Sequence, residues 1–475
     1  MLVPMLALAL TASATAQDTG LGPKKTAAVD HVVEQRAALI KMSDAIWKHA
    51  EVALREERSA RLLADYAEAK GFRVTRGVAG MPTAFVAEYG SGRPILAIMG
   101  EYDALPGISQ KAIPTKEALD EGAAGHGCGH NLFGAASLGA AVAIKRLIKK
   151  EKLKGTIRFY GTPAEESVGG KLYMVREGLF DDVDVAIAWH PSSEVRSDTE
   201  GSQALVDFVV EFRGKAAHAA YDPWNGRSAT DALETFTFAL NQMREHVRPT
   251  VRMHYAIVAG GDVPNVVPEY AKLWCWLRDS KHAQVDELLE RAKAITQGAA
   301  LCAGVEGTLT VQSGDYEFLV NFEGQRLVQD NLVALGPIPF TEAEHAFARR
   351  LQAECGVPQT GLRTTVEPFV ENPGPPQGGS TDVADVSWVV PTLHLSVTTA
   401  PAETPWHAWP VVACGGMSIG HEGMMHAAKA MAITLVDLSR DERLRGRIRA
   451  EFMAKTQGMT YQGYIPDGPP PIPQD

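Results

Sequence analysis

The sequence predicts an α/β protein with a mainly parallel β-sheet flanked by helices, and with an inserted α+β domain of the ferredoxin-like kind. Short, continuously apolar strands alternate with helical segments over residues 93–191, as is typical of a parallel sheet covered on both faces. From residue 203 the strands alternate apolar and polar side chains. The order strand-helix-strand-strand-helix-strand found there is the split βαβ pattern. A chain of 475 residues has room for both domains.

The first domain begins with helices and continues with alternating strands and helices. Residues 28–70 place apolar side chains at helical spacing and stop at Gly71, a residue type that commonly ends helices. The segments that follow are predicted, in chain order, as a strand within 93–107, a helix at 132–155, a strand within 156–166, a helix at 171–180 and a strand at 184–191.

The inserted domain is predicted over residues 203–317. Its strands lie within 203–220, 252–261, 270–279 and 306–315, and its helices at 229–246 and 284–300. Residues 318–455 return to helix and strand, with a core strand at 389–399, and complete the domain that 28–202 begins. Residues 456–475 are rich in proline and are expected to be extended.

The N-terminus has the pattern of an export signal. Leu2 to Leu10 is apolar, and Ala14-Thr15-Ala16 provides a small-residue cleavage site, so residues 1–16 are predicted to be a signal peptide. The segment before the apolar run has no Lys or Arg, which is atypical. We expect an exported, periplasmic protein. No other run approaches the ~20 apolar residues of a membrane-spanning helix, so we expect no stable membrane insertion.

Charge and cysteine content exclude other classes. The net charge is −11, and nucleic-acid binding, which relies on basic patches, is disfavoured. The five cysteines are odd in number and scattered, so they do not suggest a disulfide framework.

Side chains that can bind metal recur at one edge of the predicted sheet. The stretch "GHGCGHNLFGAASLGAA" at 125–141 alternates His126, Cys128 and His130 with glycines before a helix of small residues. Sites in open parallel sheets form beyond the carboxyl ends of strands. Ligand-type side chains beyond the other predicted strands are Glu101, Asp103, Glu165, Glu166, His190 and His407.

These residue types suit Zn²⁺ or a neighbouring divalent transition ion. These candidates outnumber the ligands that one catalytic zinc usually takes, which favours two ions that share a water molecule. The adjacent Glu165 and Glu166 fit a division in which one binds metal and the other transfers protons.

Several stretches together resemble one enzyme family. They span nearly all of 28–455 and read "GEYDALPG", "GHGCGHNLFGAA", "TPAEE", "AWHP", "FRGKAAHAAYDPWNGRSATDALE", "DVPNVVPEYAKLWCWLRD", "GGSTDVADVSW" and "WHAWPVVACGGMSIGHEGMMHAAKAMA". The chain resembles the di-metal amidohydrolases and peptidases that include aminoacylases, hippurate hydrolases and plant indole-acetyl-amino-acid hydrolases. Asn131 after Cys-Gly-His, and "TPAEE" where much of the family has "QPAEE", resemble the group formed by the B subunits of aminobenzoyl-glutamate hydrolases.

The resemblance implies a zinc-peptidase-like catalytic domain and a set of site residues. The inserted domain would serve as a lid and dimerisation domain. The implied ligands of two Zn or Mn ions are Cys128 as bridging thiolate, His130, Glu166, His190 and His407. Asp103 would support the site, and the match of His126 is usually not a ligand.

The resemblance also implies roles in catalysis and substrate binding. Glu165 would be the general base and then the acid, and His218 would reach the site of a neighbouring protomer and stabilise the oxyanion. Asn265 and Arg278 match positions tied to substrate binding, with Arg278 gripping a carboxylate. The expected assembly is a homodimer through the inserted domain, or a pair with a homologous second subunit.

The implied reaction is hydrolysis of the amide bond of N-acyl or N-aroyl amino acids, with attack by a metal-bound hydroxide. A dipeptidase or carboxypeptidase with the same centre is one alternative. A metal-binding scaffold without turnover is another, and a hydrolase that uses Cys128 as its nucleophile is a third.

Overall fold

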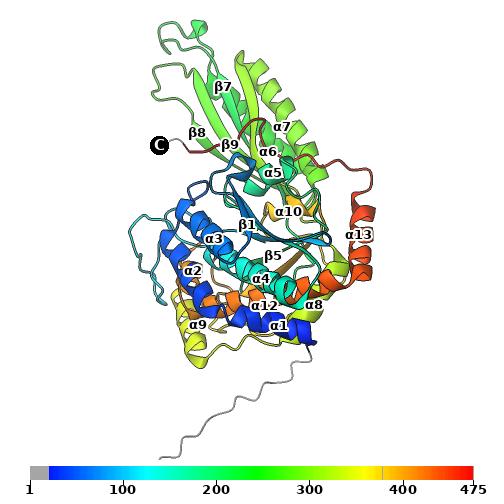
Figure 1. Ribbon diagram of the computed structural model, residues 1–475. Helices are drawn as coiled ribbons and strands as arrows, with labels where there is room; N and C mark the ends of the chain where they lie inside the picture. The colour runs from blue at the N-terminus through cyan, green and yellow to red at the C-terminus, as the bar shows by residue number, and fades with distance from the viewer. Residues whose placement is uncertain (1–20, 377, 474–475) are drawn as a thin grey trace, which may run out of the picture.

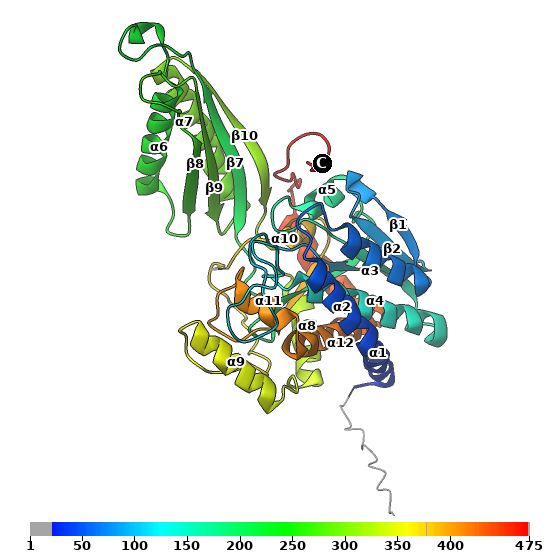
Figure 2. The same ribbon diagram turned by 90° about the vertical axis from the view of Figure 1, so that its left-hand side faces the viewer.

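The computed structural model describes residues 21–376 and 378–473, which form two bodies, each built around a β-sheet (Figures 1 and 2). Within these residues the larger body holds a seven-stranded sheet in the order β1-β2-β4-β3-β5-β11-β6, and the smaller body a four-stranded sheet in the order β10-β7-β9-β8. We call the bodies the large domain and the small domain. The predicted signal peptide, residues 1–16, lies outside the described residues.

The large sheet is parallel at its centre and antiparallel at its edges. β4, β3, β5 and β11 run parallel, whereas β1, β2 and β6 pair antiparallel with their neighbours. The strands are β1 (Arg73–Arg76), β2 (Phe85–Ser91), β3 (Ile95–Gly100), β4 (Gly155–Gly161), β5 (Val185–Ser192), β6 (Arg196–Ser197) and β11 (Thr392–Thr398). β3, β4 and β5 are buried along nearly their whole length, which explains their continuous apolar sequences.

Helices flank this sheet. α4 packs on β3 and β4, α12 packs on β5 and β11, and the two helices contact each other. The helices of the large domain are α1 (Pro23–Val33), α2 (Arg36–His49), α3 (Glu57–Ala69), α4 (His130–Glu151), α5 (Gly170–Arg176), α8 (Phe322–Leu335), α9 (Glu342–Glu354), α10 (Val383–Ser387), α11 (Trp409–Gly415), α12 (Ser418–Arg440) and α13 (Glu442–Thr456). The predicted α/β class with a mainly parallel sheet is therefore confirmed.

The small residues of α4 allow it to lie very close to the sheet. A Cβ atom on Gly134 would lie 2.7 Å from the carbonyl oxygen of Glu101, at the end of β3. α4 is long and apolar enough to cross a membrane, but 83% of its most apolar 18-residue segment is buried inside the protein. It is the central core helix of the large domain, and its N-terminus, His130, is held beside the carboxyl end of β3.

The small domain has the predicted order of strands and helices. Its strands are β7 (Ala204–Arg213), β8 (Arg252–Ala259), β9 (Tyr270–Asp279) and β10 (Glu306–Asp315), and its helices are α6 (Ala229–Met243) and α7 (His282–Ala303). Figure 2 shows both helices on one face of the sheet. Every second side chain of β7, including Phe208 and Phe212, enters the core beneath these helices, which accounts for the alternating sequence.

The C-terminal tail bridges the two domains, and its described residues, 457–473, form no helix or strand. The Tyr461 hydroxyl donates to Asp385 of α10 (2.7 Å), and the Tyr464 hydroxyl donates to Asp286 of α7 (2.5 Å). The ring of Tyr316, just after β10, lies between these tyrosines, His282 and Trp388. An aromatic cluster therefore joins the tail to the junction of the domains.

The close packing of α12 gives a stability prediction. A Cβ on Gly423 would lie 2.2 Å from the Thr398 carbonyl oxygen of β11, so Gly423→Ala forces helix and strand apart. We expect a loss of about 1–3 kcal/mol in the free energy of unfolding. Gly446 of α13 has open space around its Cβ position, so Gly446→Ala should gain up to about 1 kcal/mol from helix propensity. Thermal and urea unfolding measure the free energy of unfolding of both variants. An equal change in this free energy for Gly423→Ala and Gly446→Ala would contradict the close packing of α12 on β11.

Candidate metal centre

Residues from distant parts of the chain meet at the carboxyl edge of the large sheet. Glu101 directly follows β3, Glu165 and Glu166 follow β4, and His190 lies near the end of β5. His130 is the first residue of α4. Because β3, β4 and β5 run parallel, their carboxyl ends bring these side chains to one place.

The side chains implied as ligands form two groups that share one residue. The ligand atoms of Cys128, His130 and His190 lie within 4.8 Å of one another, and so do those of Cys128, Glu166 and His407. Cys128 Sγ is 3.3 Å from His190 Nε2, and His407 Nε2 is 3.5 Å from Glu166 Oε2. Such spacings allow two donor atoms to bind one ion, and the shared Cys128 sits where a bridging ligand would lie.

Two imidazole rings are oriented by hydrogen bonds on their far side. Asp103 Oδ1 lies 2.9 Å from His130 Nδ1, and the Pro191 carbonyl oxygen lies 2.7 Å from His190 Nδ1. If each Nδ1 donates, each Nε2 is left to bind an ion, and that of His190 lies beside Cys128. Burial lowers the pKa of His190 to about 4, which keeps its imidazole in the neutral form that binds metal. Asp103 also accepts from the Glu166 amide (2.9 Å), so it supports two candidate ligands.

The glycines around Cys128 are required by the close approach of other segments. Gly129 has φ +77°, and a Cβ there would lie 2.8 Å from Pro191 Cβ, beside His190. A Cβ on Gly127 would lie 2.3 Å from Ile108 Cδ1 and 3.2 Å from the Ala408 nitrogen. The loop can therefore bring Cys128 against β5 and the His407 segment only because these positions lack side chains.

A fully buried lysine, Lys171, lies next to Glu101 at the edge of the candidate metal centre. Lys171 Nζ donates to Glu101 Oε1 (2.6 Å) and to Asp382 Oδ1 (2.5 Å), and its amide donates to Asp382 Oδ2 (2.9 Å). Burial alone would lower the pKa of Lys171, but the charges of Asp382 and Glu101 raise it above its ordinary value. The ammonium therefore stays charged and forms ion pairs with two buried carboxylates, of whose two negative charges it balances one.

The paired glutamates have pKa values shifted upward. Burial, followed by the charges of Glu101 and Glu166, holds the pKa of Glu165 well above its usual range. Burial also raises the pKa of Glu166 to about 7. A buried carboxyl group with a raised pKa suits general acid–base chemistry, the role that the resemblance implies for Glu165.

The Cys128 thiol is a poor nucleophile in this setting. Burial and the nearby charge of Glu166 raise its pKa, so a free thiolate is disfavoured without a bound cation. This argues against the thiol-dependent alternative.

A cavity of about 750 Å³ opens onto the candidate ligands between the two domains. Cys128, Glu165 and His190 line it from the large domain, and Trp276 and Arg278 line it from β9 of the small domain. The Arg278 guanidinium lies 5.1 Å from the centre of the Trp276 ring. The structure thus places the predicted substrate-binding arginine in the cavity that holds the candidate ligands.

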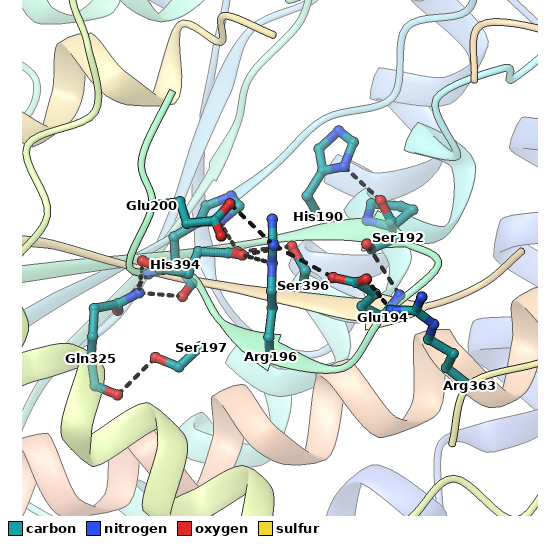
Figure 3. A network of polar contacts seen from close by, with 12 residues as sticks. His190, Ser192, Glu194, Arg196, Ser197, Glu200, Gln325, Arg363, His394 and Ser396 are labelled. Carbon is teal, nitrogen blue, oxygen red and sulfur yellow. Dashed lines mark hydrogen bonds and ion pairs between the residues drawn. The ribbon is translucent and has the colours of Figure 1, made fainter. Parts of the chain in front are cut away.

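One wall of the cavity is a polar network on β6 and β11 (Figure 3). Asp198 accepts from Arg196 Nε (2.7 Å), lies 2.6 Å from His394 Nδ1 and accepts from Ser396 Oγ (2.8 Å). Glu200 lies 3.5 Å from Arg196 Nη1. Sequence reasoning did not identify this wall, although a histidine within the apolar run of β11 was a usable signal.

His218 and Asn265 lie away from this cavity. β7 begins beside it, where Leu205 lines the wall, and runs outward for about 27 Å to Arg213. His218 and Asn265 follow at the outer end, where the Ala219 amide donates to the Asn265 carbonyl oxygen (3.0 Å). The amides of Ala220 and Tyr221 donate to His218 Nδ1, which leaves Nε2 as the protonated nitrogen of an exposed ring. Within one chain, His218 does not meet Glu165.

Two other residues of the glycine-rich stretch have structural surroundings. His126 is buried, with Nε2 3.1 Å from the Ile46 carbonyl oxygen, and it belongs to neither ligand group. Asn131 donates to Ser43 Oγ and to the Gly415 carbonyl oxygen, both at 3.0 Å. Asn131 therefore fastens the start of α4 to α2 and α11.

The chemistry of the donor atoms fits divalent transition-metal ions. Glu101 Oε2, His130 Nε2 and Glu166 Oε1 are buried and have no hydrogen-bond partner among the described residues. Orphaned polar atoms of this kind are rare and costly unless another group satisfies them. A set of thiolate, imidazole and carboxylate donors suits a divalent transition-metal ion better than it suits Ca²⁺ or Mg²⁺.

Comparison with known proteins gives consistent matches. The model of the peptidase family M20/M25/M40 matches residues 97–305. The chain is 36% identical to the B subunit of p-aminobenzoyl-glutamate hydrolase from Escherichia coli (strain K12), over 94% of this chain and 98% of that protein. It is 30% identical to the Xaa-Arg dipeptidase of Mus musculus, over 91% of this chain and 93% of that protein. A solved dinuclear metal-binding peptidase of the M20 family from Bacillus subtilis shares the fold, with a TM-score of 0.58, 18% identity, and coverage of 84% of this chain and 97% of that one.

The shared position of Cys128 gives a prediction about metal content. Cys128→Ala removes the one donor common to both ligand groups, so we expect fewer than two ions per chain after metal loading and dialysis. Elemental analysis of the purified variant measures this. Cys275→Ala is the matched control, because Cys275 is also buried but lies in β9 of the small domain. Two ions retained by Cys128→Ala would rule out Cys128 as a ligand.

Proposed function

Because the chain belongs to the peptidase family M20/M25/M40, we propose that it is a metal-dependent amidohydrolase that cleaves the bond between an acyl or aroyl group and an amino acid, as in aminobenzoyl-glutamate. The observation that carries this proposal is the position of Glu165. It lines the same cavity as Cys128 and His190, and it also lies within 4.8 Å of Glu101 and His130. A carboxyl group with a raised pKa thus stands beside a set of metal donors and open space for a substrate.

Two divalent ions, Zn or Mn, would polarise the scissile carbonyl and make water a better nucleophile at neutral pH. Cys128, His130, Glu166, His190 and His407 would hold them. Glu165 takes the proton of the attacking water and later delivers it to the nitrogen of the leaving amine. Burial of the Glu165 carboxyl favours its protonated form, which supports the second of these steps.

The small domain supplies the substrate contacts in this proposal. Arg278 grips a carboxylate of the amino-acid half, and the Trp276 ring beside it offers an apolar surface to the acyl half. Closure of the small domain over the cavity would exclude water.

We also propose that the site is completed by a second copy of the chain or by a homologous protein. His218 and Asn265 lie at the outer end of the small domain, and the exposed His218 Nε2 is available as a hydrogen-bond donor. A second chain could receive it in its own cavity, where it would stabilise the oxyanion. The 36% identical relative is the B subunit of a hydrolase whose A subunit, from the same organism, also matches this chain, at 32% over 47% of it.

A second candidate is a dipeptidase that removes a basic residue. The Xaa-Arg dipeptidase match supports it, and so do two acidic side chains in the cavity wall, Glu200 and Asp315, which could receive a cationic side chain. Export of the protein through residues 1–16 remains our proposal for its location.

The proposed function predicts the outcome of a hydrolysis screen on metal-loaded protein. Wild type should release the amino acid from N-acyl- and N-aroyl-glutamate faster than it cleaves dipeptides that end in Arg or Lys. Glu165→Gln should keep its metal and lose about 10²–10⁴-fold in kcat, because the amide cannot transfer the proton.

Glu177→Gln serves as the control, because Glu177 is an exposed residue at the end of α5. Near-normal turnover by Glu165→Gln would refute its role in proton transfer. Faster cleavage of the basic dipeptides by wild type would favour the second candidate function.

A further inference from the structure

Glu101 has one oxygen that the ion pair with Lys171 does not use. Oε1 accepts from Lys171 Nζ at 2.6 Å. Oε2 lies 3.1 Å from His130 Nε2, and Glu101 is 1% exposed. The two atoms lie within ion-pair distance of each other, but neither has a hydrogen-bond partner in the described part of the chain. Two potential metal-ligand atoms of different side chains, both without a hydrogen bond, therefore face each other.

The distance between Glu101 Oε2 and His130 Nε2 is compatible with two ligand atoms that bind the same metal ion. Zn–N and Zn–O bonds of about 2.0–2.2 Å put two donor atoms about 3.3–3.6 Å apart at a tetrahedral angle, and about 2.8–3.1 Å apart at the angle near 90° found in five-coordinate sites. The 3.1 Å between Glu101 Oε2 and His130 Nε2 corresponds to an angle of about 90–100° at a shared ion, which a five-coordinate site accepts. It resembles the 3.3 Å between Cys128 Sγ and His190 Nε2. Glu101, His130 and Glu165 also form a third group of ligand atoms within 4.8 Å of one another.

We infer that Glu101 is a sixth metal ligand, which binds through Oε2 the same ion as His130. This inference rests on the metal centre of the proposed function and deepens it. Lys171 holds Oε1 from behind and so aims Oε2 at the ion. Asp382, which takes the other contacts of Lys171, keeps the ammonium in place.

The charge around the two ions also favours this assignment. Without Glu101, the ion beside His130 and His190 would have two neutral imidazoles and the shared Cys128 thiolate as ligands. The other ion would have the same thiolate and, in addition, the Glu166 carboxylate. With Glu101, each ion receives one carboxylate and shares the thiolate. Glu101, Glu166, Cys128 and one hydroxide would then balance two divalent ions, which matters where burial weakens screening by water.

The test compares two variants that each remove one carboxylate from Lys171. Glu101→Gln keeps an acceptor oxygen for Lys171 Nζ but removes the charged oxygen beside His130. Asp382→Asn is the matched control, because both of its oxygens already have partners on Lys171. After loading with Zn²⁺ and dialysis, we expect two ions per chain in wild type and in Asp382→Asn, and one in Glu101→Gln, by elemental analysis. Calorimetric titration should show one Zn²⁺ bound by Glu101→Gln more than 100-fold more weakly, beyond the 10–100-fold loss typical of an outer-shell partner.

The outcomes separate this inference from the proposed function. Two ions bound by Glu101→Gln with wild-type affinity would overturn the ligand role and leave the metal centre standing, whereas no ion bound by wild type would overturn both. If Glu101→Gln does not fold, a crystal structure of Zn²⁺-loaded wild type decides. A distance of about 2.0–2.2 Å from metal to Glu101 Oε2 is expected. A distance above about 3 Å would overturn the inference.

Discussion

The structure depends on balancing several carboxylates that are buried together at one edge of the large sheet. Glu101, Asp103, Glu165, Glu166 and Asp382 are within reach of one another's charge. Leaving such charges uncompensated away from water costs several kcal/mol each. The single charge of the Lys171 ammonium pairs with both Glu101 and Asp382 and compensates only one of their two charges. The charges of Glu101 and Asp103 outweigh burial and raise the pKa of His130 well above its usual value. Divalent cations would neutralise the negative charge that remains on the carboxylates. Metal binding would therefore also stabilise these buried groups.

Apolar packing, and not charge, brings these carboxylates and the candidate ligands together. Apolar strands β3, β4 and β5 lie parallel and end together, and the glycines of α4 and of the loop before it let the chain come within contact distance of those ends. The small domain adds a wall that carries Arg278 and Trp276. Side chains at the strand ends, side chains of the glycine-rich loop and side chains of the small domain therefore meet in one cavity.

Much of this arrangement could be predicted from the sequence, but some parts of it could not. Apolar continuity located β3, β4 and β5, and the rule that sites lie beyond strand ends selected Glu165, Glu166 and His190. β1 and β2 were not predicted, because neither is a continuous apolar run: β1, "RVTR", is a short and mostly exposed edge strand, and β2, "FVAEYGS", buries only Phe85 and Ala87. The buried role of Lys171 was also hidden. Its partners, Glu101 and Asp382, are 70 and 211 residues away, and a lysine at a helix start looks like a surface residue until those contacts are known.

The central claim is that metal ions held by the cysteine, histidine and carboxylate donors at this edge carry amide hydrolysis. The most direct test is the hydrolysis rate of one N-aroyl-glutamate substrate by the same protein before chelation, after removal of metal, and after Zn²⁺ or Mn²⁺ is restored. We expect the rate to fall to background when metal is removed and to recover when about two ions per chain are returned. Hydrolysis that continues unchanged in metal-free protein would contradict the account.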